Sequence, residues 1–181
     1  MRLSETRLAG LYLLELDLIE DDRGAFARSF CSKEFEDAGL EFAVVQANIS
    51  FNRFAGTLRG MHLQREPHAE AKIVRCTRGA LFDVAIDLRP DSDTCCQWYG
   101  TELNADNRRA LLIPEGFAHG YQTLADDTEV HYLMSEPYVS EAATGVRFDD
   151  PAFGIEWPLD VAAISDKDKK WPSFDREARP R

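Results

Sequence analysis

The chain has 181 residues, and we expect a single domain spanning residues 1–181 with a sizeable core. Its formal net charge of −11 argues against nucleic acid as a partner, although local arginine and lysine side chains can still bind an anionic small ligand. The four cysteines match no zinc-binding spacing, so we expect reduced thiols in a cytoplasmic protein. No apolar run has the length of a membrane span or a secretion signal, and we expect no membrane partner.

Short apolar runs separated by turn residues predict a series of β-strands. In chain order they span residues 8–18, 25–30, 42–51, 58–64, 71–77, 80–88, 98–103, 109–113, 121–124 and 129–134. A short helix is predicted over residues 32–38, with Ser32 as its N-cap and Gly39 as its C-cap. The chain from Asp150 onward is predicted to be an ordered loop region. The pattern indicates an all-β sandwich or barrel with a few short helices.

Three predicted strands carry ionisable groups among apolar residues. Strand alternation puts Asp83 on one face with Leu81 and Ala85, Lys72 on one face with Val74, and Tyr132 on one face with Val130 and Met134. Burying such groups costs several kcal/mol unless they are paired or used. We therefore expect Asp83, Lys72 and Tyr132 to line a polar pocket inside the barrel, with Asp83 in a structural role, holding either His119 or the end of a strand.

Two short motifs resemble the signatures of the cupin superfamily of small double-sheet barrels. The segment Pro114–His119 resembles the second signature, in which the histidine enters the barrel on the next strand. Gly60 and His62 resemble part of the first signature, but Gln64 stands where a second metal-binding histidine would be. The sequence therefore predicts a barrel without a metal site.

Two other classes stay open as alternatives. A metal-dependent cupin enzyme would draw its ligands from His62, His68, Glu70 and His119, which are acceptable ligand types. A non-catalytic sugar-binding cupin would use the same pocket without chemistry. Elemental analysis distinguishes the first alternative, and uptake of solvent deuterium into a bound ligand distinguishes the second.

Eight segments together resemble the dTDP-4-dehydrorhamnose 3,5-epimerase family of nucleotide-sugar enzymes, over roughly residues 21–168. They are Gln46–Ser50, Gly56–Gln64, Lys72–Arg75, Phe82–Arg89, Ile113–Gly120, Tyr132, Gly154–Pro158 and Ser165–Asp168. The resemblance implies a cupin-type double-stranded β-helix, or jelly roll, and a homodimer. It also implies a nucleotide-sugar substrate and a reaction without a metal or an organic cofactor.

The resemblance also implies roles for individual residues. His62 matches the catalytic base, and Asp168 matches the carboxylate that orients it. Lys72 matches the cation beside the ketone oxygen of the sugar, and Tyr132 matches the proton donor on the opposite face. Substrate contacts are implied for Arg23, Gln46, Asn48, Arg59, His119 and Lys167.

The chemistry of epimerisation fits these residue types. A 4-keto sugar has acidic C–H bonds at C3 and C5, and removing such a proton needs a base of near-neutral pKa, which is the ordinary range of histidine. The resulting enolate needs a fixed positive charge beside its oxygen, and a second acid must stand across the ring. His62, Lys72 and Tyr132 meet these needs.

Four positions depart from the family pattern. Arg28 and Ala143 stand where the rhamnose-pathway enzymes have ligand-contacting glutamates, so Arg28 is a candidate substrate contact of different charge. Leu133 follows the tyrosine where lysine is usual, and residues 67–70 form a more charged loop. None of the four is the expected base, cation or acid. We expect the reaction class to be retained, with the nucleotide, the sugar and the choice of C3, C5 or both left open.

Overall fold

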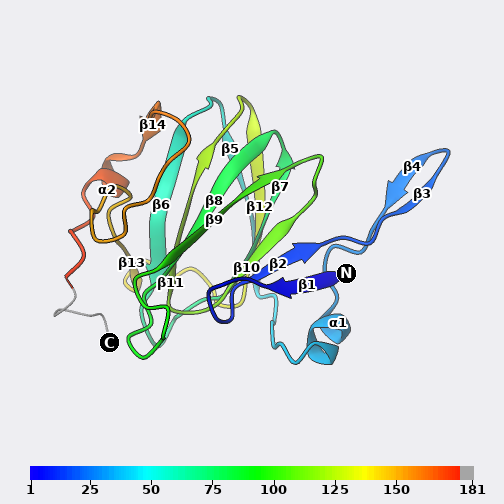
Figure 1. Ribbon diagram of the computed structural model, residues 1–181, viewed down its shortest axis with the longest axis horizontal. Coiled ribbons are helices and arrows are strands. Elements are labelled where there is room, and N and C mark those ends of the chain that lie inside the picture. The colour runs from blue at the N-terminus through cyan, green and yellow to red at the C-terminus, as the bar shows by residue number, and fades with distance from the viewer. Residues whose placement is uncertain (176–181) are drawn as a thin grey trace.

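Two β-sheets face each other in the computed structural model, which describes residues 1–175 (Figure 1). The first sheet has the strand order β1 (Arg2–Glu5), β2 (Tyr12–Glu15), β10 (Ala110–Ile113), β7 (Lys72–Arg78), β12 (Thr128–Met134) and β5 (Gln46–Asn52). The second has the order β13 (Ala143–Gly145), β6 (Thr57–Gln64), β11 (Phe117–Thr123), β8 (Ala80–Asp87) and β9 (Trp98–Asn104). A short strand, β14 (Ala163–Ile164), pairs with β6 in parallel. The predicted all-β jelly roll is confirmed.

A two-stranded hairpin and two short helices complete the elements of the described chain. The hairpin, β3 (Ile19–Asp21) and β4 (Gly24–Phe26), projects away from the sheets in Figure 1. The helices are α1 (Ser32–Asp37) and α2 (Asp166–Lys169). The prediction of Ser32 as the N-cap of α1 is wrong, because Cys31 is the extended residue that precedes the first helical turn. Gly39 follows the C-cap, Ala38, and has a φ of 74°.

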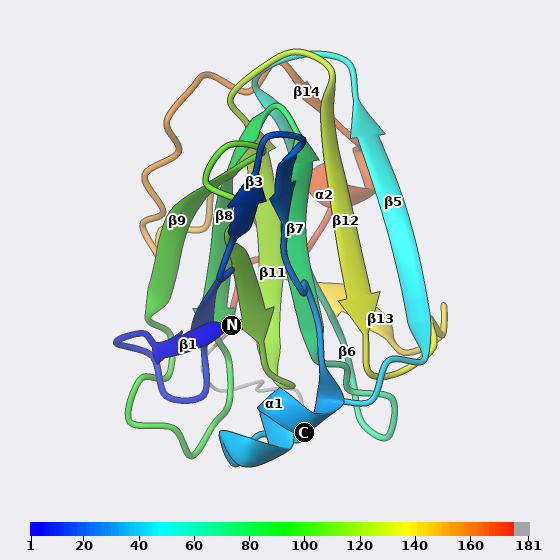
Figure 2. The same ribbon diagram turned by 90° about the vertical axis from the view of Figure 1, so that its right-hand side faces the viewer.

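The inner faces of the two sheets share one apolar core. Leu81 and Ala85 of β8 lie in this core with Val74 of β7 and Val130 of β12. The opposite face of β8 packs elsewhere, because Val84 and Ile86 belong to a second cluster with Phe153 and Trp157 from the C-terminal segment. The alternation predicted for β8 is thus confirmed. The C-terminal segment covers the outer face of the second sheet before it returns to β6 at α2 (Figures 1 and 2).

The backbones of β6 and β11 approach closely at two glycines. A Cβ atom on Gly60 would lie 2.6 Å from the Gly120 Cα atom, and a Cβ atom on Gly120 would lie 2.7 Å from the Arg59 carbonyl oxygen. Neither contact is possible for a residue with a side chain. The approach lies beside the register shift of this strand pair, and it leaves His62 of β6 directly opposite His119 of β11.

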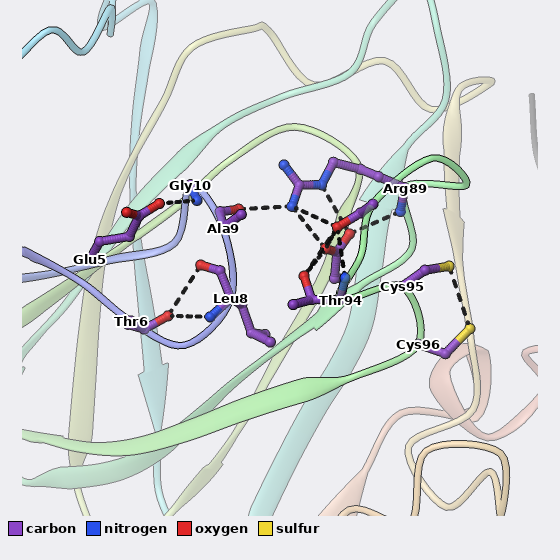
Figure 3. Close-up of polar contacts among 11 residues, drawn as sticks. Glu5, Thr6, Leu8, Ala9, Gly10, Arg89, Thr94, Cys95 and Cys96 are labelled. Atoms are coloured by element: carbon purple, nitrogen blue, oxygen red, sulfur yellow. Dashed lines mark hydrogen bonds and ion pairs between the residues drawn. The ribbon is translucent and has the colours of Figure 1, made fainter.

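Asp87 fixes the long connection that follows β8. Its carboxylate accepts hydrogen bonds from Arg89, Ser92 and Thr94. Burial works to raise the pKa of Asp87, but these hydrogen bonds outweigh it and lower the pKa below its ordinary value. Arg89 also donates to the Ala9 carbonyl oxygen at 2.8 Å, which joins this connection to the β1–β2 loop (Figure 3).

Three of the four cysteines, Cys31, Cys76 and Cys96, are free thiols. Cys76 is buried in the inner core, as expected, and burial raises its pKa to about 11. Cys95 and Cys96 lie in the connection after β8, with their sulfur atoms 3.6 Å apart (Figure 3). Within the described residues, no helix has the length and apolar character needed to cross a membrane.

Candidate active site

A cavity of ≈ 680 Å³ lies between the sheets, with walls from β5, β6, β7, β12, β13, β14 and α2. A smaller recess of ≈ 160 Å³ is lined by Ser50, Arg59, His62, Lys72, His119, Tyr121 and Tyr132. Four of these residues line both spaces: Arg59, His62, Lys72 and Tyr132. The predicted base, cation and acid therefore gather at the boundary between a large outer cavity and a small polar recess.

His62 and Asp168 form a hydrogen-bonded pair at this boundary. The His62 Nε2 atom lies 2.7 Å from Asp168 Oδ1, although the two residues are 106 positions apart in the chain. The His62 side chain is 41% exposed, whereas the Asp168 side chain is 6% exposed. A hydrogen on Nε2 that is donated to the carboxylate leaves Nδ1 as the basic nitrogen. The pair can therefore present a neutral imidazole that is ready to accept a proton.

The position of Asp168 depends on a short capped helix. Ser165 is the N-cap of α2, and its hydroxyl oxygen accepts a hydrogen bond of 3.0 Å from the Asp168 amide. Burial works to raise the pKa of Asp168, but the hydrogen bond and charge of His62, with bonds from Gly60 and Ser165, lower the pKa below its ordinary value. Asp168 is therefore a carboxylate at neutral pH and stabilises the imidazolium that forms when His62 gains a proton.

Lys72 pairs with Glu70, which the sequence analysis considered only as a ligand in the alternative metal site and as part of a charged loop. Its Nζ atom lies 2.7 Å from Glu70 Oε1, and the two side chains are 11% and 3% exposed. The second oxygen of Glu70 accepts a hydrogen bond of 2.9 Å from the Gln64 amide. The signal that could have revealed the pair is the i, i+2 spacing, which puts Glu70 and Lys72 on the same face of an extended chain.

His119 is held by Asp83 across the β11–β8 pair. The His119 Nε2 atom lies 2.8 Å from Asp83 Oδ1, and Asp83 is fully buried. The expectation that Asp83 has a structural role and holds His119 agrees with this contact. The recess thus contains a second histidine whose ring is fixed by a buried carboxylate.

Tyr132 enters the recess from β12, in the sheet opposite His62. Burial raises the pKa of Tyr132, and the nearby charge of Arg59 only partly offsets this. Arg59 is itself fixed, because its Nε atom donates to Asn52 Oδ1 at 2.8 Å. A tyrosine with a raised pKa stays protonated at neutral pH, so Tyr132 can donate a proton from the sheet that faces the base.

The outer cavity has cationic and amide groups suited to an anionic ligand. Arg59 lies at its inner end, and Lys167 lies on α2 with its Nζ atom 5.4 Å from the Trp171 ring centroid. Gln46 and Asn48 line the cavity from β5 and are joined by a hydrogen bond of 3.1 Å. The sequence singled out all of these residues except Trp171, which it placed only in an ordered loop region.

Two predicted substrate contacts lie away from this cavity within the chain. Arg23 stands on the projecting hairpin, where it is 90% exposed and pairs with Asp21. Arg28 pairs with Glu34 of α1 at 2.7 Å. Of the other departures, Ala143 and Glu70 line the cavity, whereas Leu133 packs in an apolar cluster on the other side of the first sheet.

The residues considered as metal ligands have separate partners. His62 bonds Asp168, Glu70 bonds Lys72 and His119 bonds Asp83, as described above, while His68 lies 3.0 Å from Glu136. Within residues 1–175, no group of three or more histidine, cysteine, aspartate or glutamate side chains is arranged to hold a metal ion. Gln64 instead bonds the backbone of residues 68, 137 and 139.

A jelly roll whose interior holds two histidine–carboxylate pairs, a lysine and a tyrosine defines an acid–base enzyme of the cupin type. Residues 5–176 match the family described as dTDP-4-dehydrorhamnose 3,5-epimerase. The dTDP-4-dehydrorhamnose 3,5-epimerase of Methanothermobacter thermautotrophicus is 44% identical over 173 residues, which cover 94% of this chain and 92% of that relative.

Solved structures agree with this match. The crystal structure of the Bacillus anthracis dTDP-4-dehydrorhamnose 3,5-epimerase with TDP and PPi bound aligns with a TM-score of 0.93 at 42% identity, covering 96% of this chain and 99% of that one. That of ChmJ, a 3'-monoepimerase from Streptomyces bikiniensis in complex with dTDP-quinovose, aligns with a TM-score of 0.86 at 32% identity, covering 93% and 85%. The chain belongs to the dTDP-4-dehydrorhamnose 3,5-epimerase family and is an isomerase that epimerises nucleotide-linked 4-keto-6-deoxy sugars.

The lowered pKa of Asp168 predicts a pH-dependent contribution to stability. Its ordinary value is 3.8, so the contribution is fully present above that pH and is lost as the pH falls through the lower value of the folded state. We expect Asp168→Asn to lower the free energy of unfolding by about 1–2 kcal/mol at pH 7, and the difference from wild type to shrink toward zero near pH 2. Urea unfolding at fixed protein concentration measures this.

Asp166→Asn is the matched control, because Asp166 lies on the same helix and its side chain is 86% exposed. It should change the stability much less at every pH. A difference between wild type and Asp168→Asn that stays constant from pH 7 to pH 2 would contradict the charged pairing of Asp168 with His62.

Proposed function

We propose that the enzyme acts on a dTDP-linked 4-keto-6-deoxy hexose and inverts both C3 and C5 without a metal or an organic cofactor. The observation that carries this proposal is the gathering of His62, Lys72 and Tyr132 at the boundary between the outer cavity and the recess. The outer cavity of ≈ 680 Å³ falls in the size range of cofactor and small-molecule sites, whereas the recess of ≈ 160 Å³ is smaller and lined by polar side chains, so we assign the nucleotide to the cavity and the sugar to the recess. The enzyme would work in the cytoplasm, where thiols such as those of Cys31 and Cys76 stay reduced.

The mechanism begins with removal of a proton next to the ketone. The basic nitrogen of His62 takes the proton from the ring carbon. The C–H electron pair then forms a double bond to the ketone carbon, and the carbonyl π electrons move to the oxygen to give an enolate. Asp168, 2.7 Å from the imidazole, stabilises the imidazolium that results. Lys72 faces the same space and provides positive charge for the enolate oxygen.

The second half of the reaction returns a proton to the opposite face. Tyr132 stands on the sheet that faces β6, and its raised pKa keeps the phenol protonated until the enolate is formed. Donation from Tyr132 to the ring carbon gives the inverted centre and a phenolate, to which the nearby Arg59 provides positive charge. Proton exchange with solvent then restores both groups for the next carbon.

The relatives support the choice of nucleotide and of carbons. The Bacillus anthracis structure has TDP bound, which supports a thymidine diphosphate for this chain. The family model that matches residues 5–176 is that of the 3,5-epimerases, and the relative that is 44% identical is a dTDP-4-dehydrorhamnose 3,5-epimerase. These matches support inversion at both carbons.

We also propose that the enzyme is a homodimer in which the β3–β4 hairpin of one subunit reaches its partner. Ile19 and Phe26 on this hairpin are 68% and 69% exposed, and Ile49 on the edge strand β5 is 67% exposed. Exposed apolar side chains on a hairpin and on an unpaired sheet edge are typical of surfaces that a second subunit covers. Such a dimer would bring Arg23 near the cavity of the partner, which accounts for a substrate contact far from the cavity of its own chain.

Replacing His62 tests the function directly. Wild-type enzyme incubated in deuterated water with dTDP-4-keto-6-deoxyglucose should incorporate deuterium at C3 and C5, as located by NMR. His62→Ala should lose about 10²–10⁴-fold in exchange rate because it lacks the general base. A panel with other nucleotides tests the choice of dTDP.

His68→Ala is the control, since His68 is also a hydrogen-bonded histidine but lies outside the cavity lining. A wild-type protein that binds the nucleotide sugars and exchanges no deuterium would indicate a non-catalytic sugar-binding cupin. Exchange by His62→Ala at the wild-type rate would exclude His62 as the base.

Replacing Tyr132 should separate exchange from inversion. Tyr132→Phe keeps the ring and its packing but removes the acidic proton. Deuterium should still enter from the His62 side, while net epimerisation falls at least tenfold. Tyr121→Phe serves as a comparison, because Tyr121 also lines the recess but its hydroxyl donates to Ser50 at 2.9 Å. Equal loss of exchange and inversion in Tyr132→Phe would contradict the two-face mechanism.

The dimer proposal predicts a dimer mass at micromolar concentration by light scattering. Phe26→Glu should weaken the dimer, because a charge in an apolar interface is costly. In mixed dimers of Arg23→Glu and His62→Ala subunits, one of the two cavities would combine both intact residues, so activity should partly return. A monomeric wild type, or no recovery in mixed samples, would overturn the proposal.

A further inference from the structure

The carboxylate of Glu70, which lies two residues before β7, forms part of the cavity wall. Its side chain is 3% exposed and has two contacts, the Lys72 ammonium at 2.7 Å and the Gln64 amide at 2.9 Å. A buried carboxylate is costly unless both its charge and its hydrogen-bonding capacity are used. The Gln64 amide provides a hydrogen bond to one carboxylate oxygen, and the Lys72 ammonium balances the negative charge.

The two contacts differ in what they require of residue 70. The Gln64 amide needs only an acceptor oxygen, which a glutamine side chain would also provide. The Lys72 ammonium is different, because a neutral amide cannot balance a buried positive charge. The charge of Glu70 is therefore accounted for by Lys72, not by the backbone.

Lys72 needs such a partner because of its other neighbours. Apart from Glu70, the charged and titratable groups that share its cavity or recess are Arg59 and His62 from β6, His119 and Tyr121 from β11, Tyr132 from β12, Tyr138 after β12, and Lys167 and Asp168 from α2. Asp168 is already bonded to His62. Arg59 and Lys167 repel the Lys72 ammonium, and a lysine side chain has four rotatable bonds through which it can turn away.

We propose that Glu70 is a positioning residue that holds the Lys72 ammonium at the boundary of the cavity and the recess. This inference rests on the proposed function, in which Lys72 stabilises the enolate. A fixed donor stabilises the developing charge without first having to reorganise, so loss of Glu70 raises the barrier more than it weakens substrate binding. Glu70 touches neither the substrate nor the reacting atoms in this account and acts through Lys72.

Glu70→Gln separates the two contacts, because glutamine can keep the Gln64 hydrogen bond but loses the charge. We expect kcat to fall about 10–100-fold and KM to change less than about threefold. Glu70→Asp restores the carboxylate with a shorter reach and should recover part of the lost kcat. Glu66→Gln is the control for a general loss of negative charge, because Glu66 is exposed on the same loop, and it should behave as wild type.

A measurement without substrate keeps this inference distinct from the proposed function. In protein labelled with ¹⁵N at its lysine side chains, the signal absent from Lys72→Arg identifies the Lys72 ammonium. An ammonium group that is fixed in one position gives a sharp, shifted signal. Glu70→Gln should move or broaden the Lys72 signal, whereas Glu66→Gln should leave it unchanged. This result stands even if the dTDP sugar proves to be the wrong substrate.

Two outcomes would overturn the positioning role. One is an unchanged Lys72 signal in folded Glu70→Gln protein. The other is a Glu70→Gln variant with wild-type kcat, or one in which Glu70→Asp recovers nothing although both variants fold. If Glu70→Gln fails to fold, Glu70→Asp alone tests the inference, since a shorter carboxylate must still shift the Lys72 signal and lower kcat.

Discussion

Buried charges must be paired, and the site of this enzyme is built from that constraint. Three ionic or charge-assisted pairs line the interior: His62 with Asp168, Lys72 with Glu70, and His119 with Asp83. Each aspartate or glutamate is almost fully buried, so removing its partner would leave an uncompensated charge. The pairs therefore hold the reactive side chains in place, and the same contacts that allow the groups to be buried also orient them for chemistry.

The two sheets and the C-terminal segment each contribute different side chains to the site. The first sheet contributes Lys72 and Tyr132, while the second contributes His62 and His119. Asp168 comes from neither sheet, because the C-terminal segment covers the outer face of the second sheet and then places α2 beside β6. The proposed base, His62, and the proposed acid, Tyr132, thus stand on opposing walls, which is the geometry that inversion of a ring carbon requires.

Sequence patterns predicted the central strands well because their alternation and turn residues are local features. Strands β6, β7, β8, β9 and β12 lie within one residue of their predicted bounds at each end. Strand β11 begins at Phe117, four residues before the predicted start, because pairing with β8 extends it through a segment that resembled a turn. Strand β1 was not predicted, since pairing with β2 stabilises a mostly polar edge segment.

The candidate site shows the same contrast: strand alternation predicts which face a side chain lies on, but it does not predict contacts between residues far apart in the chain. Alternation alone placed Lys72, Tyr132 and Asp83 on inner faces. The contact of Asp168 with His62 spans 106 positions, so only the family resemblance could suggest it. The pairing of Glu70 with Lys72 was missed because the charged loop was interpreted as a departure near the ligand. Arg23 and Arg28 do not line the cavity of their own chain, because each lies on the segment before β5 and pairs with an acidic neighbour there, which no local sequence pattern indicated.

The measurement that tests this account most directly is a crystal structure of the enzyme with dTDP-glucose, an unreactive analogue of the keto sugar. We expect a diphosphate near Arg59 and Lys167, and a hexose in the recess with His62 and Tyr132 on opposite faces of its ring. The basic nitrogen of His62 should lie about 3–3.5 Å from a ring carbon. A hexose outside the recess, or His62 and Tyr132 on the same face of the ring, would contradict the account.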